Sequence, residues 1–218
     1  MGIISMHNVV RHLEKIAERY APSRMLSYEL AHVFMALQLT RRNGKISRNV
    51  LMDELKLGEG SIKTLVKHLK MQGYVETSNA GMWLTKKGEA IYDKLESAIP
   101  KEMPLGKCSL GLGDYNHAIL VKGLGNEIKT GIEQRDAAIK VGALGATTLI
   151  FQENKFLMPD RNQDSLRKDA KLRNQMLENL KPEENDVIII ASSDNKRNAD
   201  LAAKSAALET IADHEKHF

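Results

Sequence analysis

The sequence has a single cysteine among its 218 residues, Cys108, so it cannot form an intramolecular disulfide framework. It has no apolar run near the roughly 20 residues needed to span a bilayer. Its N-terminus also lacks a basic segment followed by an apolar one. Aromatic residues are only 5% of the chain, whereas 42% of residues are hydrophobic and 28% are charged, which is typical of a globular protein. We therefore expect a cytoplasmic protein with no membrane partner and room for two ordinary domains.

Motifs of known catalytic or nucleotide-binding sites are also missing. Two glycine-rich stretches, residues 111–113 and 123–125, match neither GK[ST] nor GxGxxG, and we interpret them as turns. His214 and His217 have a spacing that suits a metal, but no cluster of carboxylates or thiols accompanies them. Spacing reveals no Ser/His/Asp or paired-carboxylate arrangement, although such groups can assemble across a fold. We expect no catalytic residue, no metal and no cofactor, and hence a protein that is not an enzyme.

Positive charge is concentrated in the first half of the chain. Residues 1–100 hold 15 Lys and Arg against 10 Asp and Glu, whereas residues 101–218 hold 17 against 18. Lys and Arg that neutralise phosphates supply the non-specific part of DNA affinity. The excess is modest and is weak evidence by itself.

Residues 47–84 have the pattern of two short helices joined by a tight turn and followed by a small hairpin. In the second helix Lys63, Lys67 and Lys70 share one face, which suits contact with a polyanion. Gly58 allows a sharp turn before this helix, and Gly73 follows it at the position of a left-handed cap. A different face carries the apolar residues that recur every three or four positions: Ile62, Leu65, Val66 and Leu69.

The string LKLGEGSIKTLVKHLKMQGYV, with the later LTKKGEAIYDKL, resembles the winged helix-turn-helix of prokaryotic transcription regulators over residues 26–98. The resemblance implies that the second helix enters the major groove of double-stranded DNA and that its early exposed positions contact bases. The wing corresponds to residues 74–84, whose tip carries no basic residue for a deep minor-groove contact. The alternative is a winged helix that serves protein contacts only. The expected DNA-binding residues are Ser61, Lys63, Thr64 and Lys67, together with Lys70, Arg48 and Asn79.

A leading amphipathic helix is expected over residues 6–20. Its apolar stripe either packs on the N-terminal domain or pairs with a second copy of the chain. Winged-helix regulators usually dimerise, because two recognition helices match a palindromic site. We slightly favour pairing over packing.

The remaining N-terminal segments are assigned by local pattern. Residues 26–41 are the next helix, and residues 45–46 a brief strand that joins the wing. Ser47 can cap the following helix, and a last helix covers residues 86–97. The helix after Ser47 is expected to bury Val50, Leu51 and Leu55.

Residues 99–106 contain two prolines and a glycine, which stop a helix and stiffen the chain, so we assign them to a linker. The later chain follows the order β-α-β-β-α-β-α. This order predicts an α+β sandwich, with a ferredoxin-like topology in which helices cover one face of a four-stranded sheet. Strands are expected at residues 118–121, 147–151, 156–158 and 186–191, the last one central, and helices at residues 126–141, 164–180 and 199–211. In the first of these helices the residues expected to face the core are Ile128, Ile132, Ala137, Ala138 and Val141.

The string GIEQRDAAIKVGALGATTLIF, followed by LMP, is similar to the C-terminal domain of a small archaeal family of winged-helix proteins. The similarity covers residues 111–213 and implies a DNA-binding head with a sensing body, without a known ligand or catalytic residue. The expected domains are residues 1–98 for DNA binding, residues 99–106 as a linker, and residues 107–218 for sensing or dimerisation.

Two polar groups in the second half are candidates for binding an anionic effector. Arg135 and Asp136 lie in a helix that also faces the core, and the alternative is a solvated or salt-bridged pair without a role. The arginine would receive either an effector or the partner subunit. Ser192, Ser193 and Asp194 follow an apolar strand and lead into a helix, where backbone N–H groups and hydroxyls hold anions. The alternative there is ordinary N-capping.

The sequence therefore predicts a homodimeric transcription regulator that binds double-stranded DNA and responds to a small-molecule or anionic effector. One alternative is an enzyme with its active site in the second domain and the winged helix as an adaptor. Another is an architectural DNA-binding protein without an effector.

Overall fold

The structure is a computed structural model that describes residues 8–17, 27–159, 161 and 163–216. The chain divides into two compact units between Leu95 and Glu96, and each unit is described by itself. The ends of the helix expected over residues 6–20, along with His217, lie outside the described residues. No helix in the described part of the chain combines the length and apolarity needed to cross a membrane.

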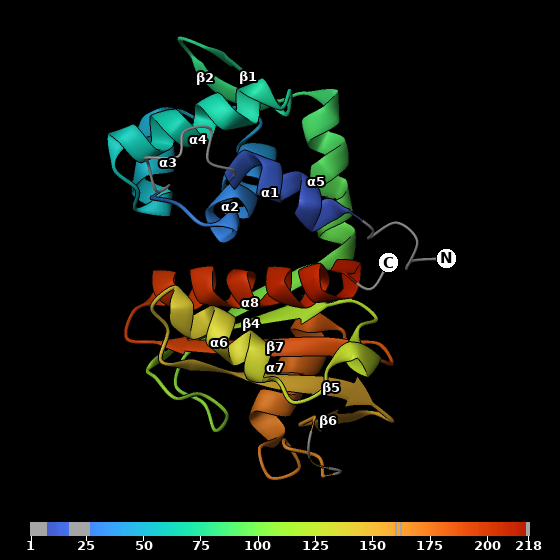
Figure 1. Cartoon of the computed structure of the whole chain (residues 1–218). Helices are drawn as coiled ribbons and strands as arrows, with labels where there is room; N and C mark the ends of the chain where they lie inside the picture. Colours follow the sequence, from blue (N-terminus) through green and yellow to red (C-terminus); the bar gives the residue numbers. More distant parts are fainter. Residues whose placement is uncertain (1–7, 18–26, 160, 162, 217–218) are drawn as a thin grey trace. The chain divides into compact units, whose positions relative to one another are not determined.

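The first unit is mainly helical (Figure 1). Its elements are α1 (Val9–Ala17), α2 (Leu30–Asn43), α3 (Arg48–Leu55), α4 (Glu59–Met71), the hairpin β1 (Val75–Ser78) and β2 (Gly81–Leu84), and α5 (Lys86–Ala98), which crosses the boundary. The bridge between Ile46 and Met82 confirms the short strand that joins the hairpin. Ser47 caps α3 by accepting a hydrogen bond from Val50 N–H, as expected.

Two expectations for this unit are wrong in detail. Val50 is 43% exposed, because α3 turns Leu51 and Leu55 inward and leaves Val50 on its outer side. The apolar stripe of α1 is buried within its own unit against α2 and α4, so it is not an open pairing surface for a second copy. Packing, the alternative to pairing, is what the structure shows.

The second unit is a mixed α+β domain, which confirms the expected fold class. Its strands are β3 (Lys101–Leu105), β4 (Tyr115–Val121), β5 (Gly145–Gln152), β6 (Lys155–Leu157) and β7 (Asp186–Ser193), and its helices are the 3-10 turn η1 (Gly125–Glu127), α6 (Ile132–Lys140), α7 (Ala170–Leu180) and α8 (Lys196–Lys216). The strands form one antiparallel sheet in the order β3-β4-β7-β5-β6. β7 is central and fully buried, as its run of apolar residues predicted.

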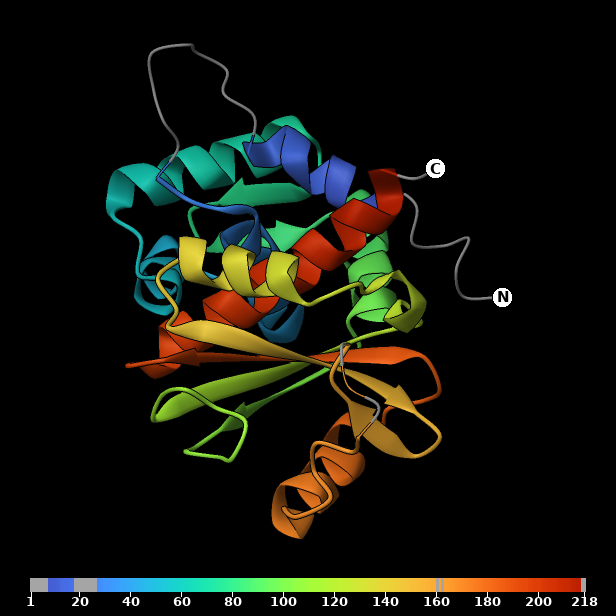
Figure 2. The same ribbon diagram turned by 60° about the horizontal axis from the view of Figure 1, so that its bottom comes forward.

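The expected four-stranded, ferredoxin-like sheet with helices on one face is wrong. Residues 101–105, assigned to a linker, are a fifth strand that pairs with β4. The proline at position 104 is tolerated because β3 is an edge strand, where one side of the backbone needs no partner. α6 and α8 cover one face, whereas α7 covers the other face over Leu105, Leu120 and Ile188 (Figure 2).

The single helix expected over residues 126–141 is also wrong. Gly131 has a φ of +77°, a left-handed conformation that ends helical geometry, so η1 and α6 are separate. α6 buries Gln134 and Ala138, while Ile132, expected inward, is 47% exposed. The helix expected from residue 164 begins at Ala170, because Asp164 instead receives hydrogen bonds from the backbone of Phe156 and Leu166.

Candidate nucleic-acid interface

The α3–turn–α4 segment is fixed by local chain chemistry. Lys56 ends α3 in the left-handed conformation with a φ of 54°, and Gly58 stands at the N-cap of α4. Ile62, Leu65 and Leu69 are completely buried and hold α4 against the rest of the unit. The opposite face of α4 is therefore presented to solvent by a rigid support.

Three lysines form a strip along this exposed face of α4: Lys63, Lys67 and Lys70. Lys63 Nζ lies 2.7 Å from Glu59 Oε1, an ion pair one turn apart. The hydrogen bond from Lys63 lowers the pKa of the Glu59 carboxyl, which therefore stays charged at neutral pH. Lys67 and Lys70 are exposed and make no ion pair with any described residue. Their ammonium groups are the ones best placed to meet an external anion.

The two hydroxyl residues expected to contact bases differ in their surroundings. Ser61 is half-buried, and its hydroxyl lies 2.8 Å from the hydroxyl of Ser27. Thr64 is also half-buried and donates to the carbonyl of Gly60 at 2.9 Å. Ser61 therefore lies off the lysine strip, whereas Thr64 lies beside Lys63 and Lys67 with its hydroxyl turned back to its own helix.

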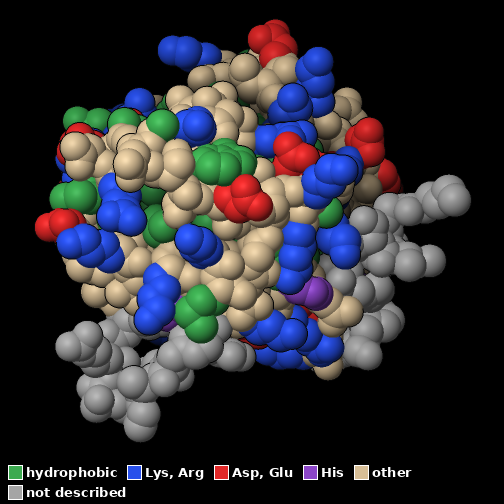
Figure 3. Space-filling view, turned by 90° about the horizontal axis from the view of Figure 1, so that it is seen from above, with side chains coloured by type: hydrophobic (Ala, Val, Ile, Leu, Met, Phe, Trp, Pro, Cys, Tyr) green, Lys and Arg blue, Asp and Glu red, His purple; other side chains and the backbone are tan. Residues whose placement is uncertain are grey.

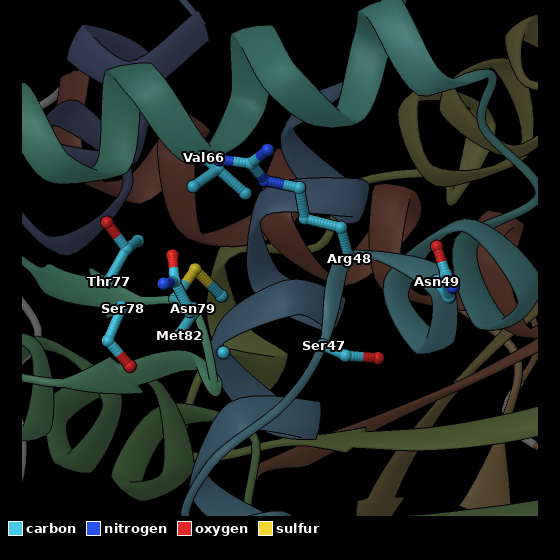
Figure 4. A pocket seen from close by; sticks show the side chains of 9 residues that line it. Ser47, Arg48, Asn49, Val66, Thr77, Ser78, Asn79 and Met82 are labelled. Atoms are coloured by element: carbon cyan, nitrogen blue, oxygen red, sulfur yellow. The ribbon is translucent and has the colours of Figure 1, made fainter.

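A pocket of about 320 Å³ lies beside α4, between the start of α3 and the β1–β2 hairpin (Figure 4). Arg48 extends toward Val66, and Asn79 approaches from the hairpin side. The other lining residues are Ser47, Asn49, Thr77, Ser78, Gly81 and Met82. This lining offers a guanidinium, amides and hydroxyls and includes no carboxylate. It brings together two residues expected to bind DNA, Arg48 and Asn79, which are far apart in the sequence.

The hairpin itself is short and uncharged at its tip. Asn79 and Ala80 form a two-residue turn between β1 and β2. Gly81 has a φ of +127°, and a Cβ there would lie 2.7 Å from the carbonyl oxygen of Ile46, so only glycine fits. The hairpin therefore contributes the Asn79 amide rather than a cation. Seen from the hairpin side, Lys and Arg side chains are spread over the surface with a few acidic ones among them (Figure 3).

A buried polar contact behind α4 was not predicted from the sequence. His68 is 5% exposed, and its Nδ1 lies 2.7 Å from the hydroxyl of Tyr28 and 2.8 Å from the carbonyl oxygen of Ile16. The Tyr28 hydroxyl also donates to Ile16 at 2.9 Å. This contact joins the end of α1 to the inner face of α4. The signal in the sequence was a histidine within the apolar stripe of a helix, which suggests a core partner.

In the second unit, most of the expected effector residues are engaged by other groups of the same chain. Arg135 donates to Oδ1 of Asp136 from Nε at 3.1 Å and from Nη2 at 3.0 Å, and both side chains are about half exposed. The two residues therefore form a local ion pair on the surface of α6. It leaves the second carboxylate oxygen of Asp136 without a partner among the described residues.

Ser192 and Ser193 are the last residues of β7 and are 1% and 2% exposed. The Ser192 hydroxyl donates to Oδ1 of Asn116 at 2.6 Å and accepts from the backbone N–H of Leu112 at 3.0 Å. N-capping of α8 falls to Asn195 instead, whose side chain accepts from Asn198 N–H at 2.9 Å. Only Asp194 is exposed. The Ser192 hydroxyl therefore makes its hydrogen bonds within the second unit.

A buried charged cluster links β3, β4 and α8 and was missed by sequence reasoning. Lys204 is 1% exposed, and its ammonium bonds to Glu102 Oε2 at 2.5 Å and to Asp200. His117 Nε2 lies 3.4 Å from Glu102 Oε2 and 3.5 Å from Asp200 Oδ1. Burial alone would raise the pKa of the Glu102 carboxyl, but hydrogen bonds from His117 and Lys204 and the charge of Lys204 outweigh it and lower that pKa.

Glu102, His117 and Asp200 are close enough to hold a metal ion, with ligand atoms within 4.8 Å of one another. The Lys204 ammonium already bonds to both carboxylates and supplies the positive charge that a metal would bring. We therefore interpret the cluster as a structural ion-pair network. His214, the histidine raised above for metal binding, is buried 3.8 Å from Glu127 and is not part of it.

Comparisons with known proteins fit the division into two units. Residues 30–99 match the family model described as the CggR N-terminal DNA binding domain. Residues 112–211 match the family model described as a domain of unknown function (DUF4443). No curated protein matches the chain.

Among solved structures, the chain is similar to the hypothetical protein PH0730 from Pyrococcus horikoshii OT3. The two share 27% sequence identity with a TM-score of 0.66, and the match covers 83% of this chain and 91% of that one. The likeness therefore extends over both units.

Proposed function

We propose that this protein is a sequence-specific transcription regulator whose first unit is a winged helix-turn-helix that binds double-stranded DNA. The observation that carries the proposal is the lysine strip on α4 beside a carboxylate-free pocket. Both lie within residues 30–99, which match a DNA-binding domain of a regulator. The second unit is proposed to dimerise and to sense an effector, since a palindromic site requires two copies.

In this proposal α4 enters the major groove with Lys63, Thr64 and Lys67 toward base edges and Lys70 toward the backbone. The pocket between α3, α4 and the hairpin then receives a backbone phosphate, held by Arg48 and Asn79. A guanidinium and neutral donors suit a phosphate oxygen, because charge-assisted hydrogen bonds are the strongest available. The carboxylate of Glu59 would repel the phosphates of the DNA backbone, and its ion pair with Lys63 reduces that repulsion.

The experiment that tests this function is DNA binding over a salt series, with random and genomic fragments side by side. A steep fall in affinity with salt and one enriched fragment would support a sequence-specific regulator. A steep fall without preference would replace it with an architectural role. Absence of binding at low salt would overturn the proposal.

Replacing Lys67 with alanine should weaken DNA binding and reduce the slope of log K against log salt by about one, if its ammonium contacts a phosphate. If Lys67 instead reads guanine, the variant should lose about 1–3 kcal/mol of discrimination at one base pair. Binding curves on matched and mismatched fragments separate these outcomes. Lys94→Ala, an exposed lysine on α5, is the control. Equal binding by both variants and wild type would contradict the placement of α4.

A further inference from the structure

The exposed face of α6 carries two large apolar side chains among charged ones. Ile132 and Ile139 are each 47% exposed, whereas Gln134 is 4% exposed and Ala138 is completely buried. Helices on the surface of a globular protein normally place apolar residues inward and polar residues outward. A helix that buries a glutamine and exposes two isoleucines indicates a surface that meets a further partner.

The two isoleucines stand two turns apart on one row, because positions seven apart share a helix face. Arg135 and Asp136 lie between them along the helix, one on each side of the row. Their mutual hydrogen bonds use only Oδ1 of Asp136. The backbone positions of Arg135 and Asp136 therefore flank the isoleucine row, and we call these two sides the arginine edge and the aspartate edge. In the single chain the two side chains bond each other, and the exposed Glu133 and Lys140 lie beyond Asp136.

Further apolar side chains extend this stripe beyond the end of α6. Leu144 is 45% and Leu112 67% exposed. Both leucines are anchored to Ser192 through their backbones. The Ser192 hydroxyl accepts a hydrogen bond from the N–H of Leu112, and the Ser192 carbonyl accepts one from the N–H of Leu144 at 2.8 Å. A Cβ on Gly145 would lie 2.8 Å from Leu112 Cδ1 and 4.0 Å from Arg135 Cγ, so Leu112 adjoins the arginine edge. We define the α6 patch as Leu112, Ile132, Arg135, Asp136, Ile139 and Leu144.

The charges of the α6 patch complement those of a second copy in one arrangement. If a two-fold axis runs roughly along α6, the arginine edge of one copy faces the aspartate edge of the other, twice. Ile132 and Ile139 then meet their own counterparts, as residues in an isologous interface do. An antiparallel pairing would instead place Arg135 beside Arg135 and Asp136 beside Asp136. A partner of single charge sign would leave one edge opposed by like charge.

We propose that the α6 patch is the homodimer interface, with the two α6 helices side by side and pointing the same way. The proposal rests on the proposed function only for the existence of a dimer. A stable dimer buries about 800 Å² on each partner. A single helix stripe falls short of that, so the contact extends over Leu112 and Leu144 at the adjoining end of the sheet. Figure 2 shows α6 beside α8 on one face of the sheet.

The test is the oligomeric state of the full chain, measured by analytical ultracentrifugation across a dilution series. Ile139→Lys should raise the dimer Kd by about a hundredfold or more, because two buried isoleucines are lost per dimer. Lysine suits the last turn of a helix, so the fold should persist. Met71→Lys is the matched control, since Met71 is 56% exposed in the last turn of α4. Circular dichroism melting checks that both variants fold.

Charge reversal tests the arrangement separately. Arg135→Glu and Asp136→Arg should each weaken the dimer, and the double variant should restore it. A wild-type protein that is monomeric at every concentration would overturn the dimer and this interface, while DNA binding over the salt series would still report on the first unit. A dimer that survives Ile139→Lys, or a double variant no better than the singles, would overturn the interface alone.

Discussion

Replacing Gly88 with alanine should destabilise the first unit by about 3 kcal/mol or more and abolish DNA binding with it. Gly88 is in the first turn of α5 and is buried. A Cβ there would overlap the carbonyl oxygen of Tyr74 and lie 2.9 Å from its carbonyl carbon. These are backbone atoms, which cannot move away by rotating a side chain.

The contact matters because the Tyr74 backbone is fixed on both sides. Its carbonyl accepts from Thr85 N–H at 3.0 Å, and its own N–H donates to Leu69 at 3.0 Å. A shift of Tyr74 would therefore disturb the end of α4, the hairpin and the start of α5 together. Thermal and urea unfolding followed by circular dichroism should show the loss.

Gly60→Ala is the matched control, because Gly60 is also a helical glycine but has no atom within 4 Å of a Cβ built on it. Alanine at position 60 should raise the free energy of unfolding of the first unit by about 0.5–1 kcal/mol through its higher helix propensity. Equal stability of the two variants would contradict the close approach of α5 to Tyr74.

Replacing Lys204 with alanine should lower the free energy of unfolding by about 3–5 kcal/mol, because it leaves the carboxylates of Glu102 and Asp200 without their buried counter-charge. The effect should depend on pH. The folded-state pKa of Glu102 is lowered from 4.5, so its stabilising contribution is present above pH 4.5 and is lost as the pH falls through the folded pKa. The difference between wild type and Lys204→Ala should therefore narrow on acidification.

A neutral version of the cluster provides the control for this prediction. Combining Lys204→Met with Glu102→Gln and Asp200→Asn removes both signs of charge and keeps similar volumes. Replacing a complete buried ion pair is often neutral, whereas removing one partner is not. The triple variant should thus be more stable than Lys204→Ala in urea titrations. A triple variant as unstable as the single would contradict the view that the unpaired carboxylates destabilise Lys204→Ala.

The first unit was largely predictable because its signals are local. The Ser47 cap, the apolar stripe of α4 and the turn glycine at position 58 each determine structure within a few residues. The constraint at Gly88 was not predictable, since it arises from a backbone that comes close only in the folded unit. A glycine inside a helical pattern was the only local sign of it.

The second unit was harder to predict because its structure depends on long-range pairing. The proline at position 104 suggested a linker, and only pairing with β4 shows that it lies in an edge strand. The lysine at position 204 lies in an alanine-rich stretch of α8. The sequence does not show which groups pair with it, because one partner comes from β3 and the other from its own helix. Ile132 was expected inward because periodicity reveals an apolar position but not whether the chain itself covers it.

The central place of β7 also determines when each unit can form during synthesis. β7 hydrogen-bonds to both β4 and β5, yet it begins only at Asp186. Until β7 has left the ribosome, β4 and β5 lack the strand that lies between them, and their apolar side chains remain exposed. The helical unit ends at Leu95 and relies on contacts nearer in sequence, which form faster. During synthesis the first unit should therefore fold before the sheet of the second unit is complete, because that sheet lacks its central strand until β7 has been made.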